Sequence, residues 1–330
     1  MRRHLSVISL AAVTAAVLAA CGGDGEASST SESPTEGADG LTDITVQVMP
    51  IVDTAPFHLG LEQGIFEEHG LDITFDSTNQ GGAVTIPGVT SGDYDFGFSN
   101  SPALITGVSN GLPLTIVANA SSSNGDPDGD TAGIIVPPDS DITSPADLAG
   151  RSVAVNTLNS IGDTSVRATV NGDGGDGSTI EFVELAFPDA PNAVLNGDVD
   201  AAWVVEPFVT IARNAGLTYL TSPYVGADPN LNIAVYFTSQ QLADENPELV
   251  QAFADAMHEA QAYAQDNPDE VRDVMGTYTE IDEDVRAEVT LPAFHDDVTA
   301  EEIQTVIDML AEQGVVPESF PAEDMMFTAE

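Results

Sequence analysis

Short apolar runs alternate with helical patterns along most of the chain from Ile44 onward. The runs are rich in β-branched residues and end at turn-forming residues, which is typical of strands. A first series of expected strands covers residues 44–49, 72–76, 95–99 and 114–118, and a second covers 152–156, 180–185, 201–205 and 218–221. Because helical stretches separate these runs, the rhythm predicts parallel α/β units.

The two series align without gaps at an offset of 105 residues (197 − 92). Gly70 falls on Gly175, Gly92-Asp93-Tyr94-Asp95 falls on Gly197-Asp198-Val199-Asp200, Pro102 falls on Pro207, and Gly111 falls on Gly216. Each match has a structural reason. A Gly-Asp-x-Asp tract forms a turn that leads into a strand, proline is favoured in the first turn of a helix, and glycine can end a helix in the left-handed conformation. The alignment predicts two similar lobes.

Two more apolar runs, 132–137 and 234–238, flank the second series. We expect them to cross between the lobes as a two-strand hinge with a crevice beside it. Helices are expected at 247–267, 268–278 and 299–313, the last opening with a capping box from Thr299 to Glu302, and they pack back on the first lobe. The predicted domains are lobe 1 at 43–135 plus 238–330 and lobe 2 at 136–237.

Ligands of open α/β sheets bind beyond the carboxyl ends of the strands, against helix N-termini. The expected ligand-binding residues at these positions are Asp53, Thr54, Gln80, Gly81, Asn100, Ser101, Asn156, Thr157, Ser160, Gly162, Trp203 and Glu206. This small, polar set suits a ligand that carries an anionic or strongly accepting group. Asp53, Asn100 and Glu206 equally suit plain helix N-caps, Trp203 a core aromatic, and Gln80-Gly81-Gly82 a turn.

The first forty residues have the pattern of an export signal followed by a spacer. Residues 1–20 have a cationic start and an apolar run, as in a signal peptide, and they end at Leu18-Ala19-Ala20-Cys21, which resembles a lipobox. The resemblance implies cleavage before Cys21 and lipidation of that residue, with residues 21–42 as a flexible linker. The alternative is an ordinary cleaved secretory signal, in which the Cys21 thiol has no function. Arg2 and Arg3 leave open whether export follows the general or the twin-arginine route.

The composition excludes several classes of function. The chain has 54 acidic and 7 basic residues, a net charge of −47, and all seven basic residues are arginine. Binding to nucleic acid or to an anionic membrane surface is excluded, because both need clustered cations. The absence of lysine also removes Schiff-base chemistry and the P-loop lysine. The acid excess favours solvation in concentrated salt over a charge-driven binding role.

Catalytic and metal sites find no support in the sequence. The histidines have neither metal-site spacing nor a nucleophile partner, so no catalytic residue, metal or cofactor is expected. Asp126-Pro127-Asp128-Gly129-Asp130 begins like a calcium loop, but Pro137 stands where the twelfth-position glutamate belongs, and calcium binding by this loop stays open.

Several motifs together resemble one known family. They are Gly64-Ile65-Phe66-Glu67-Glu68-His69-Gly70-Leu71, Ser91-Gly92-Asp93-Tyr94-Asp95, the stretch 144–155, and Gly197-Asp198-Val199-Asp200-Ala201-Ala202-Trp203 leading to Glu206-Pro207-Phe208. This pattern is similar to solute-binding lipoproteins of ABC importers, in the nitrate/sulfonate/taurine group that also includes thiamine-pyrimidine binders. The resemblance implies a two-lobed, type II periplasmic-binding-protein-like α/β fold. It also implies a monomer anchored through Cys21 at the outer face of the cytoplasmic membrane, which delivers its ligand to an ABC permease and its ATPase.

The ligand and the exact role stay open between alternatives. The first expectation is a small organic anion or zwitterion of the sulfonate, taurine or nitrate kind. The alternative is a thiamine-precursor-type pyrimidine or other heterocycle, stacked on Trp203 with Glu206 accepting from an amino group. A ligand-sensing lipoprotein is a further alternative. The resemblance also extends to pyrimidine synthases that use pyridoxal phosphate, but a chain without lysine cannot hold that cofactor in their way.

Overall fold

The structure is a computed structural model that describes residue 37, residues 40–78 and residues 81–328. Every described residue belongs to one compact unit, Ser33–Glu330. The expected signal peptide, Cys21, most of the linker and Gln80 lie outside the described residues. No helix in the described part is long and apolar enough to cross a membrane.

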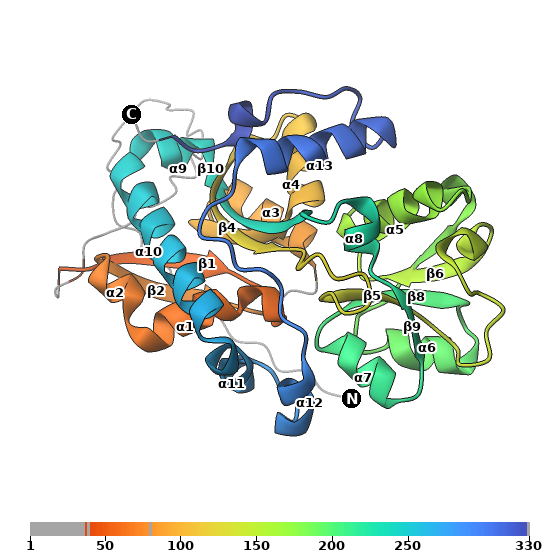
Figure 1. The fold of residues 1–330 in the computed structure, drawn as a ribbon. Coiled ribbons are helices and arrows are strands. Elements are labelled where there is room, and N and C mark those ends of the chain that lie inside the picture. Colours follow the sequence, from red (N-terminus) through yellow and green to blue (C-terminus); the bar gives the residue numbers. More distant parts are fainter. Residues whose placement is uncertain (1–36, 38–39, 79–80, 329–330) are drawn as a thin grey trace, which may run out of the picture. The chain divides into compact units, whose positions relative to one another are not determined.

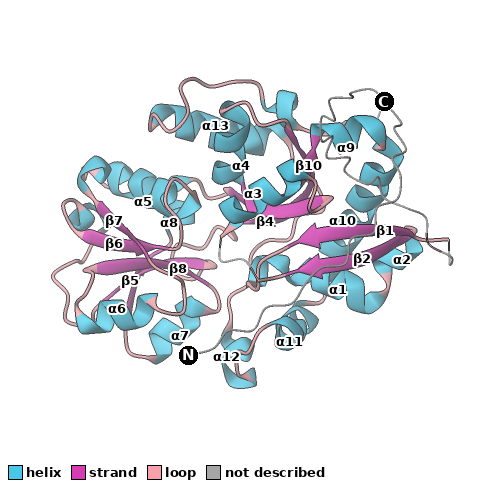
Figure 2. Ribbon diagram, turned by 180° about the vertical axis from the view of Figure 1, so that it is seen from behind, coloured by secondary structure: helices cyan, strands magenta, loops and turns pink. Residues whose placement is uncertain are grey.

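Five strands form the first sheet, in the order β2-β1-β3-β10-β4 (Figures 1 and 2). They are β1 (Thr42–Gln47), β2 (Leu71–Asp76), β3 (Phe96–Asn100), β4 (Leu114–Ser122) and β10 (Asn232–Ser239). β1 pairs in parallel with β2 and β3, whereas β10 runs antiparallel between β3 and β4. Every residue of β3 is buried, as expected for a strand covered on both faces.

The second sheet also has five strands, in the order β7-β6-β8-β5-β9 (Figure 2). They are β5 (Ala132–Val136), β6 (Ser152–Val155), β7 (Glu181–Glu184), β8 (Ala201–Val205) and β9 (Thr218–Thr221). β6 pairs in parallel with β7 and β8, and β5 runs antiparallel between β8 and β9. The order repeats that of the first sheet strand for strand, so the predicted likeness of the two lobes is confirmed.

Helices cover both faces of each sheet (Figure 1). Around the first sheet lie α1 (Ala55–Gln63), α2 (Ile65–Glu68), α3 (Gly82–Ser91) and α4 (Ser101–Ser109). Around the second lie α5 (Ile161–Gly172), α6 (Ala190–Asn196), α7 (Phe208–Asn214) and α8 (Pro223–Ala227). In Figure 1, α5 and α8 lie on one side of the second sheet and α6 and α7 on the other.

Several helices follow β10, and the three predicted ones pack on the first lobe. The helices after β10 are α9 (Gln240–Glu245), α10 (Pro247–Asp266), α11 (Pro268–Tyr278), α12 (Glu283–Glu288) and α13 (Ala300–Glu312). α10 packs against α1 and β4, and α13 packs against α4. The predicted capping box is present, because Glu302 N donates to Thr299 Oγ1 at 3.2 Å and Thr299 N donates to Glu302 Oε2 at 2.8 Å.

Strand pairing corrects the predicted boundary between the lobes. The prediction ends the first part of lobe 1 at residue 135, but β5 pairs with β8 and β9 of the second sheet. It also starts the second part of lobe 1 at residue 238, but β10 already belongs to the first sheet from Asn232. The crossings therefore lie in the loops before β5 and before β10. Local periodicity identifies an apolar strand but not the sheet that receives it.

The matched turns of the two lobes have matched roles. Gly92 ends α3 with φ 79° and Gly197 ends α6 with φ 73°, both left-handed. Asp95 Oδ2 then accepts from Thr45 N at 2.7 Å and Thr45 Oγ1 at 2.8 Å. Asp200 Oδ2 accepts in the same way from Ser152 N at 2.8 Å and Ser152 Oγ at 2.7 Å. Each Gly-Asp-x-Asp tract thus ties the start of one parallel strand, β3 or β8, to the neighbouring parallel strand, β1 or β6.

Candidate functional site

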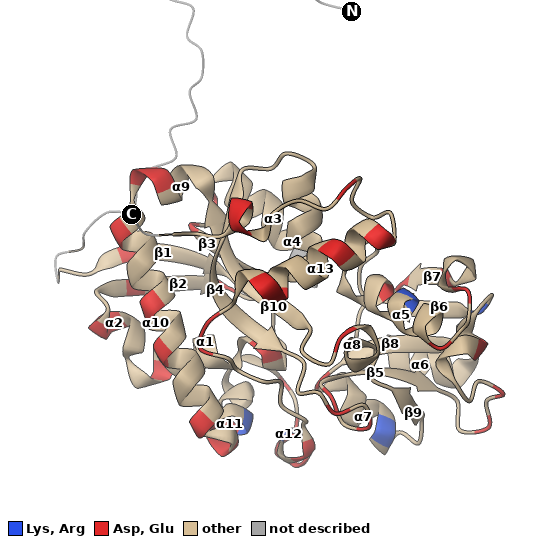
Figure 3. Ribbon diagram, turned by 45° about the horizontal axis from the view of Figure 1, so that its top comes forward, with Lys and Arg blue, Asp and Glu red and all other residues tan. Residues whose placement is uncertain are grey.

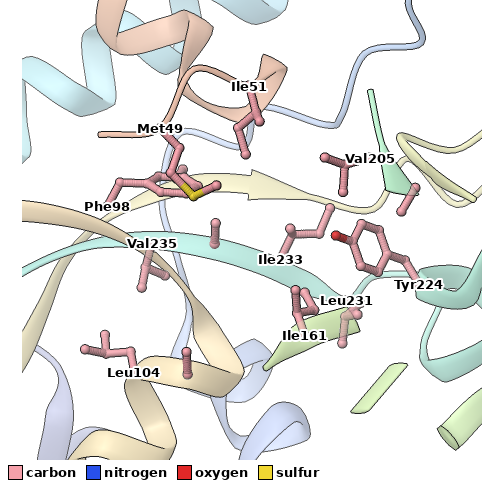
Figure 4. Packing of buried hydrophobic residues seen from close by; sticks show 14 of the residues in the cluster. Met49, Ile51, Phe98, Leu104, Ile161, Val205, Tyr224, Leu231, Ile233 and Val235 are labelled. Atoms are coloured by element: carbon pink, nitrogen blue, oxygen red, sulfur yellow. The ribbon is translucent and has the colours of Figure 1, made fainter. Parts of the chain in front are cut away.

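One cavity is lined by residues from both lobes, several of them at or just beyond the carboxyl ends of parallel strands. The first lobe contributes Met49, Ile51, Asp53, Phe98, Asn100, Ile233 and Ala234, and the second contributes Asn156, Ile161, Phe187, Trp203, Val205 and Tyr224. Figure 4 shows the hydroxyl of Tyr224 pointing toward Ile233 across this space. The cavity measures about 30 Å³, room for about two water molecules. A larger ligand therefore requires the lining groups to move apart.

Four of the predicted ligand-binding residues line this cavity: Asp53, Asn100, Asn156 and Trp203. Asp53 and Asn100 come from the first lobe, after β1 and at the end of β3, and Asn156 and Trp203 come from the second, after β6 and within β8. Within each sheet the parallel strands end at the same edge, which brings the two residues of that lobe together. The rule for open α/β sheets therefore located the polar part of the cavity from the sequence.

Asp53 lies in a 3-10 turn, Val52–Thr54, between β1 and α1. Its side chain is buried, with 3% of the residue exposed, and Oδ1 accepts from Ser121 Oγ at 2.5 Å. The pKa of this carboxyl is raised to about 6. Loss of hydration is the main cause, the Ser121 hydrogen bond opposes the rise, and the nearby charge of Asp130 adds to it. Asp53 is thus a buried acid within reach of the cavity.

Trp203 on β8 is buried, and its indole lies against the start of α5. A Cβ atom on Gly162 would lie 2.6 Å from Trp203 Cε3, so the helix approaches the ring closely only because residue 162 is glycine. The Phe187 and Tyr224 rings lie 5.5 Å and 6.2 Å from the indole between centroids. Trp203 Nε1 is buried without a hydrogen-bond partner among the described residues, which is unusual for a buried indole.

Asn100 has two roles at the cavity. Its Oδ1 accepts from Ala103 N at 3.0 Å, so it is the N-cap of α4. Its Nδ2 donates to Ser160 Oγ at 2.9 Å, which joins the first lobe to the second. Ser160 is itself the N-cap of α5, in a capping box with Asp163. The N-cap alternative therefore describes Asn100 correctly, without excluding it from the cavity.

Glu206 does not line the cavity. Its carboxylate accepts from Thr210 N at 3.0 Å and Thr210 Oγ1 at 2.9 Å, in the first turn of α7, and from Thr290 N at 3.2 Å. Burial raises the pKa of this carboxyl, and the hydrogen bonds oppose the rise. The contact between Glu206 and a ligand amino group therefore stays a prediction, and in this structure the Glu206 oxygens accept hydrogen bonds from Thr210 and Thr290.

Several other predicted residues make contacts within the chain around the cavity. Thr54 Oγ1 donates to Met49 O at 2.7 Å, and Ser101 Oγ donates to Asn232 Oδ1. A Cβ atom on Gly81 would lie 2.6 Å from Thr157 Cγ2, so these two residues mark a close approach between the lobes. Gln80 lies outside the described residues.

The sequence interpretation missed the apolar majority of the cavity. Met49, Ile51, Phe98, Phe187 and Tyr224 all line it, and none was singled out. The available signal was large apolar residues directly at strand ends, beside the polar ones. These residues are equally suited to a core, which is why the pattern alone did not mark them.

The described arginines all lie outside the cavity. Figure 3 shows cationic residues near α5, α7 and α11. Their partners are Asp141 for Arg151, Gly177 O for Arg167, Asp128 O for Arg213, Val289 O for Arg272, and Ile281 O for Arg286. Within the described part of the chain, the cavity therefore has a carboxylate but no cationic lining residue.

The acidic loop 126–130 uses its carboxylates internally. Asp130 is buried and accepts from Ser123 Oγ at 2.7 Å, Thr131 N at 2.8 Å and Ser222 Oγ at 3.1 Å. Ser123 lies in the crossing loop before β5 and Ser222 lies between β9 and α8 of the second lobe, so Asp130 links the first crossing to the second lobe. Nowhere in the described residues do three or more His, Cys, Asp or Glu side chains form a group able to hold a metal.

Larger hollows lie elsewhere on the first lobe. One of about 870 Å³ is bordered by α9, α10 and the C-terminal segment, with Asp244, Glu248 and Asp255 among its lining residues. Its described lining comes from the first lobe and from the C-terminal segment packed on that lobe. The second lobe contributes no described lining residue there, whereas both lobes line the cavity at Asp53.

Comparison with known proteins identifies the family. Residues 52–271 match the NMT1/THI5-like family. The chain belongs to the NMT1/THI5-like family. The family resemblance drawn from the sequence is thereby confirmed.

Relatives of this NMT1/THI5-like chain are binding proteins. It is 29% identical to the taurine-binding periplasmic protein of Escherichia coli K12 over 195 residues, 59% of this chain and 57% of the relative. It is 24% identical to the formylaminopyrimidine-binding protein of Halalkalibacterium halodurans over 227 residues, 67% of this chain and 65% of the relative. The matches thus span less than two thirds of either relative's length.

A solved structure supports the fold. The periplasmic aliphatic sulphonate-binding protein SsuA of Escherichia coli superposes with a TM-score of 0.70 at 19% identity, covering 87% of this chain and 92% of that one. The predicted two-lobed α/β fold of the periplasmic-binding-protein kind is therefore confirmed.

Proposed function

We propose that this protein is the extracytoplasmic solute-binding component of an ABC importer. It captures a small organic anion or zwitterion between its lobes and delivers it to the permease and its ATPase. The observation that carries the proposal is the cavity lined by strand ends of both lobes, within a chain of the NMT1/THI5-like family. The likeness to a taurine-binding protein supports the sulfonate and taurine class of ligand.

The proposal assigns binding rather than catalysis to the site. Its support is the lining itself, which is mostly apolar with two amides, one carboxylate, one phenol hydroxyl and one indole N–H. Closure over a ligand stabilises the lobes in contact, and the Asn100–Ser160 hydrogen bond is one contact that closure forms.

A thiamine-precursor-type heterocycle is the second candidate ligand. The Trp203, Phe187 and Tyr224 rings favour it, because they offer an aromatic wall on the second lobe. The amino-group acceptor in this version is Asp53 rather than Glu206. The formylaminopyrimidine-binding relative supports this candidate more distantly.

Thermal unfolding of the purified protein in molar salt tests the function. The panel contains taurine, alkanesulfonates, nitrate and aminopyrimidines. A ligand at about 100 times its Kd adds about 2.7 kcal/mol of stability, which shifts the midpoint measurably. A shift from one compound class supports the proposal, and no shift from any of them contradicts the proposed ligand classes. Uptake of the labelled ligand in a deletion strain then separates importer from sensor, since intact uptake contradicts the importer.

We further propose a monomer anchored through Cys21, with residues 1–20 as the signal peptide and 21–42 as the linker. The lobes comprise approximately the predicted segments, with their boundaries moved to the loops before β5 and β10. A Cys21→Ser variant tests the anchor by membrane fractionation. Release of the variant from the membrane fraction supports lipidation, and unchanged membrane retention contradicts it.

A further inference from the structure

The cavity contains one carboxylate in surroundings that offer it no counter-charge. Asp53 is buried, and no ion pair within the described residues includes it. The other lining residues are apolar side chains, two amides, the Tyr224 hydroxyl and the Trp203 indole. Buried charges in proteins are normally paired, because an unpaired one loses its hydration without compensation.

The wider surroundings are negative as well. Asp130 is the charged group that acts on Asp53 through space, and the described arginines have their partners elsewhere. His58, near Tyr278, supplies no cation, since burial lowers its pKa to about 3. A ligand that presented only negative charge here would meet repulsion from Asp53 without a compensating cation.

We propose that Asp53 selects the solute by receiving a protonated amine or a ring amino group, so that the ligand is an amine-bearing compound rather than a simple anion. This inference rests on the proposed function and narrows its ligand class. A zwitterion such as taurine meets the requirement, and so does an aminopyrimidine. Nitrate and unsubstituted alkanesulfonates do not, because they lack a donor for the carboxylate.

Trp203 supplies the complementary end of the site. Its buried Nε1–H has no acceptor among the described residues, so an acceptor oxygen or nitrogen on the ligand would satisfy it. Asp53 and Trp203 come from different lobes. A ligand with a donor at one end and an acceptor at the other therefore contacts both lobes at once, which is the requirement for stabilising closure.

Matched ligand pairs test the proposal by calorimetry. Taurine is compared with isethionate, in which a hydroxyl replaces the amine, and a 4-aminopyrimidine is compared with its 4-hydroxy analogue. The wild-type protein is expected to bind the amine member of at least one pair about tenfold or more tightly. Asp53→Asn is expected to remove that preference, whereas the exposed Asp72→Asn on β2 keeps it.

The pH dependence of wild-type affinity gives a second readout that needs no variant. Protonation of Asp53 removes its attraction for an ammonium group, so affinity for the amine member falls as the pH is lowered below about 6. The other titratable groups coupled to Asp53 are Asp130, Tyr224, Tyr236 and Tyr278. The tyrosines stay neutral in this range because burial raises their pKa values.

Three outcomes are distinguishable. An amine preference that is lost in Asp53→Asn supports the inference. Equal or tighter binding of the amine-free members, unchanged in Asp53→Asn, overturns the inference and leaves the proposed function standing. Binding of no member of either pair to the wild-type protein contradicts the proposed ligand classes, and the inference fails with them.

Discussion

Asn100 donates a hydrogen bond through Nδ2 to the hydroxyl of Ser160, 2.9 Å away, and joins the end of β3 to the start of α5. Both residues are also N-caps, so each fixes its own helix while it contacts the opposite lobe. Contact between the lobes is thus built from groups whose positions are already determined within each lobe.

Gly81→Ala is expected to weaken ligand affinity about tenfold by opposing contact between the lobes. The added Cβ atom would lie 2.6 Å from Thr157 Cγ2. Gly81 has φ −168°, an extended conformation that alanine adopts freely, so the effect is steric rather than backbone strain. Calorimetry measures the affinity. Thr157→Ser removes the opposing methyl group, and the double variant is expected to recover binding. Failure of that rescue would show that the two residues act independently.

Gly162→Ala is expected to destabilise the protein by about 1–3 kcal/mol, because its Cβ atom would lie 2.6 Å from the Trp203 ring. Gly172→Ala is the matched control in the same helix, since a Cβ atom there meets nothing closer than Gly226 O at 4.0 Å. Chemical unfolding measures both variants, and tryptophan fluorescence reports the ring, which is the only tryptophan in the chain. Equal stabilities of the two variants would contradict the tight packing at Trp203.

Asp53→Asn is expected to stabilise the unliganded protein at neutral pH. Folding raises the pKa of Asp53 from 3.8 to about 6, so the ionised buried carboxylate costs about 3 kcal/mol above that pH. The cost disappears as the pH falls from about 6 toward about 4, where the folded protein holds a proton that the unfolded chain releases. Unfolding free energies of both proteins across this range test the prediction, and a stability difference that does not change with pH would refute it.

Asp130→Asn is expected to lower the free energy of unfolding by about 1–3 kcal/mol. The Asp130 carboxylate accepts hydrogen bonds from two hydroxyls and one N–H group, and the amide N–H₂ of asparagine would face these donors with donors of its own. Asp128→Asn, two residues away and exposed, is the control and is expected to have no measurable effect. Urea unfolding compares the two. If the Asp130 variant is as stable as the control, the carboxylate does not stabilise the link between the crossing loop before β5 and Ser222.

Salt is expected to stabilise the fold. With a net charge of −47, screening relieves self-repulsion as the Debye length falls from about 10 Å at 0.1 M to about 3 Å at 1 M. The unfolding midpoint is therefore expected to rise with KCl at neutral pH. Near pH 4, where many carboxylates are protonated, the same addition is expected to raise it less. A midpoint independent of KCl would contradict the halophilic interpretation of the composition.

Strands were predictable from sequence where burial leaves an unmistakable apolar run. Ala201–Val205 is buried at every position and was predicted with its observed bounds. The sheet that receives a strand was not predictable for β5 and β10, because each pairs antiparallel with strands distant in sequence. Such pairings depend on tertiary packing rather than on local periodicity.

The site was predictable only in part, for a chemical reason. Asn100 and Glu206 are both polar residues at strand ends before a helix. Asn100 lines the cavity, whereas the Glu206 carboxylate accepts hydrogen bonds from Thr210 and Thr290. N-cap and ligand contact need the same residue types, so the sequence pattern does not separate them. The apolar lining, such as Phe98 and Tyr224, has the composition of a core.

The order of strands along the chain also sets the order in which the sheets can be completed during synthesis. All five strands of the second sheet lie in one continuous stretch, from Ala132 to Thr221. In the first sheet, β10 is the one described strand that pairs with β4, and it ends at Ser239, more than a hundred residues after β4. The second lobe therefore has all its strands synthesised before the first lobe does, because β4 cannot pair until β10 has been made. A chain truncated after Thr221 would therefore contain every strand of the second sheet but lack β10, which separates β3 from β4 in the first sheet.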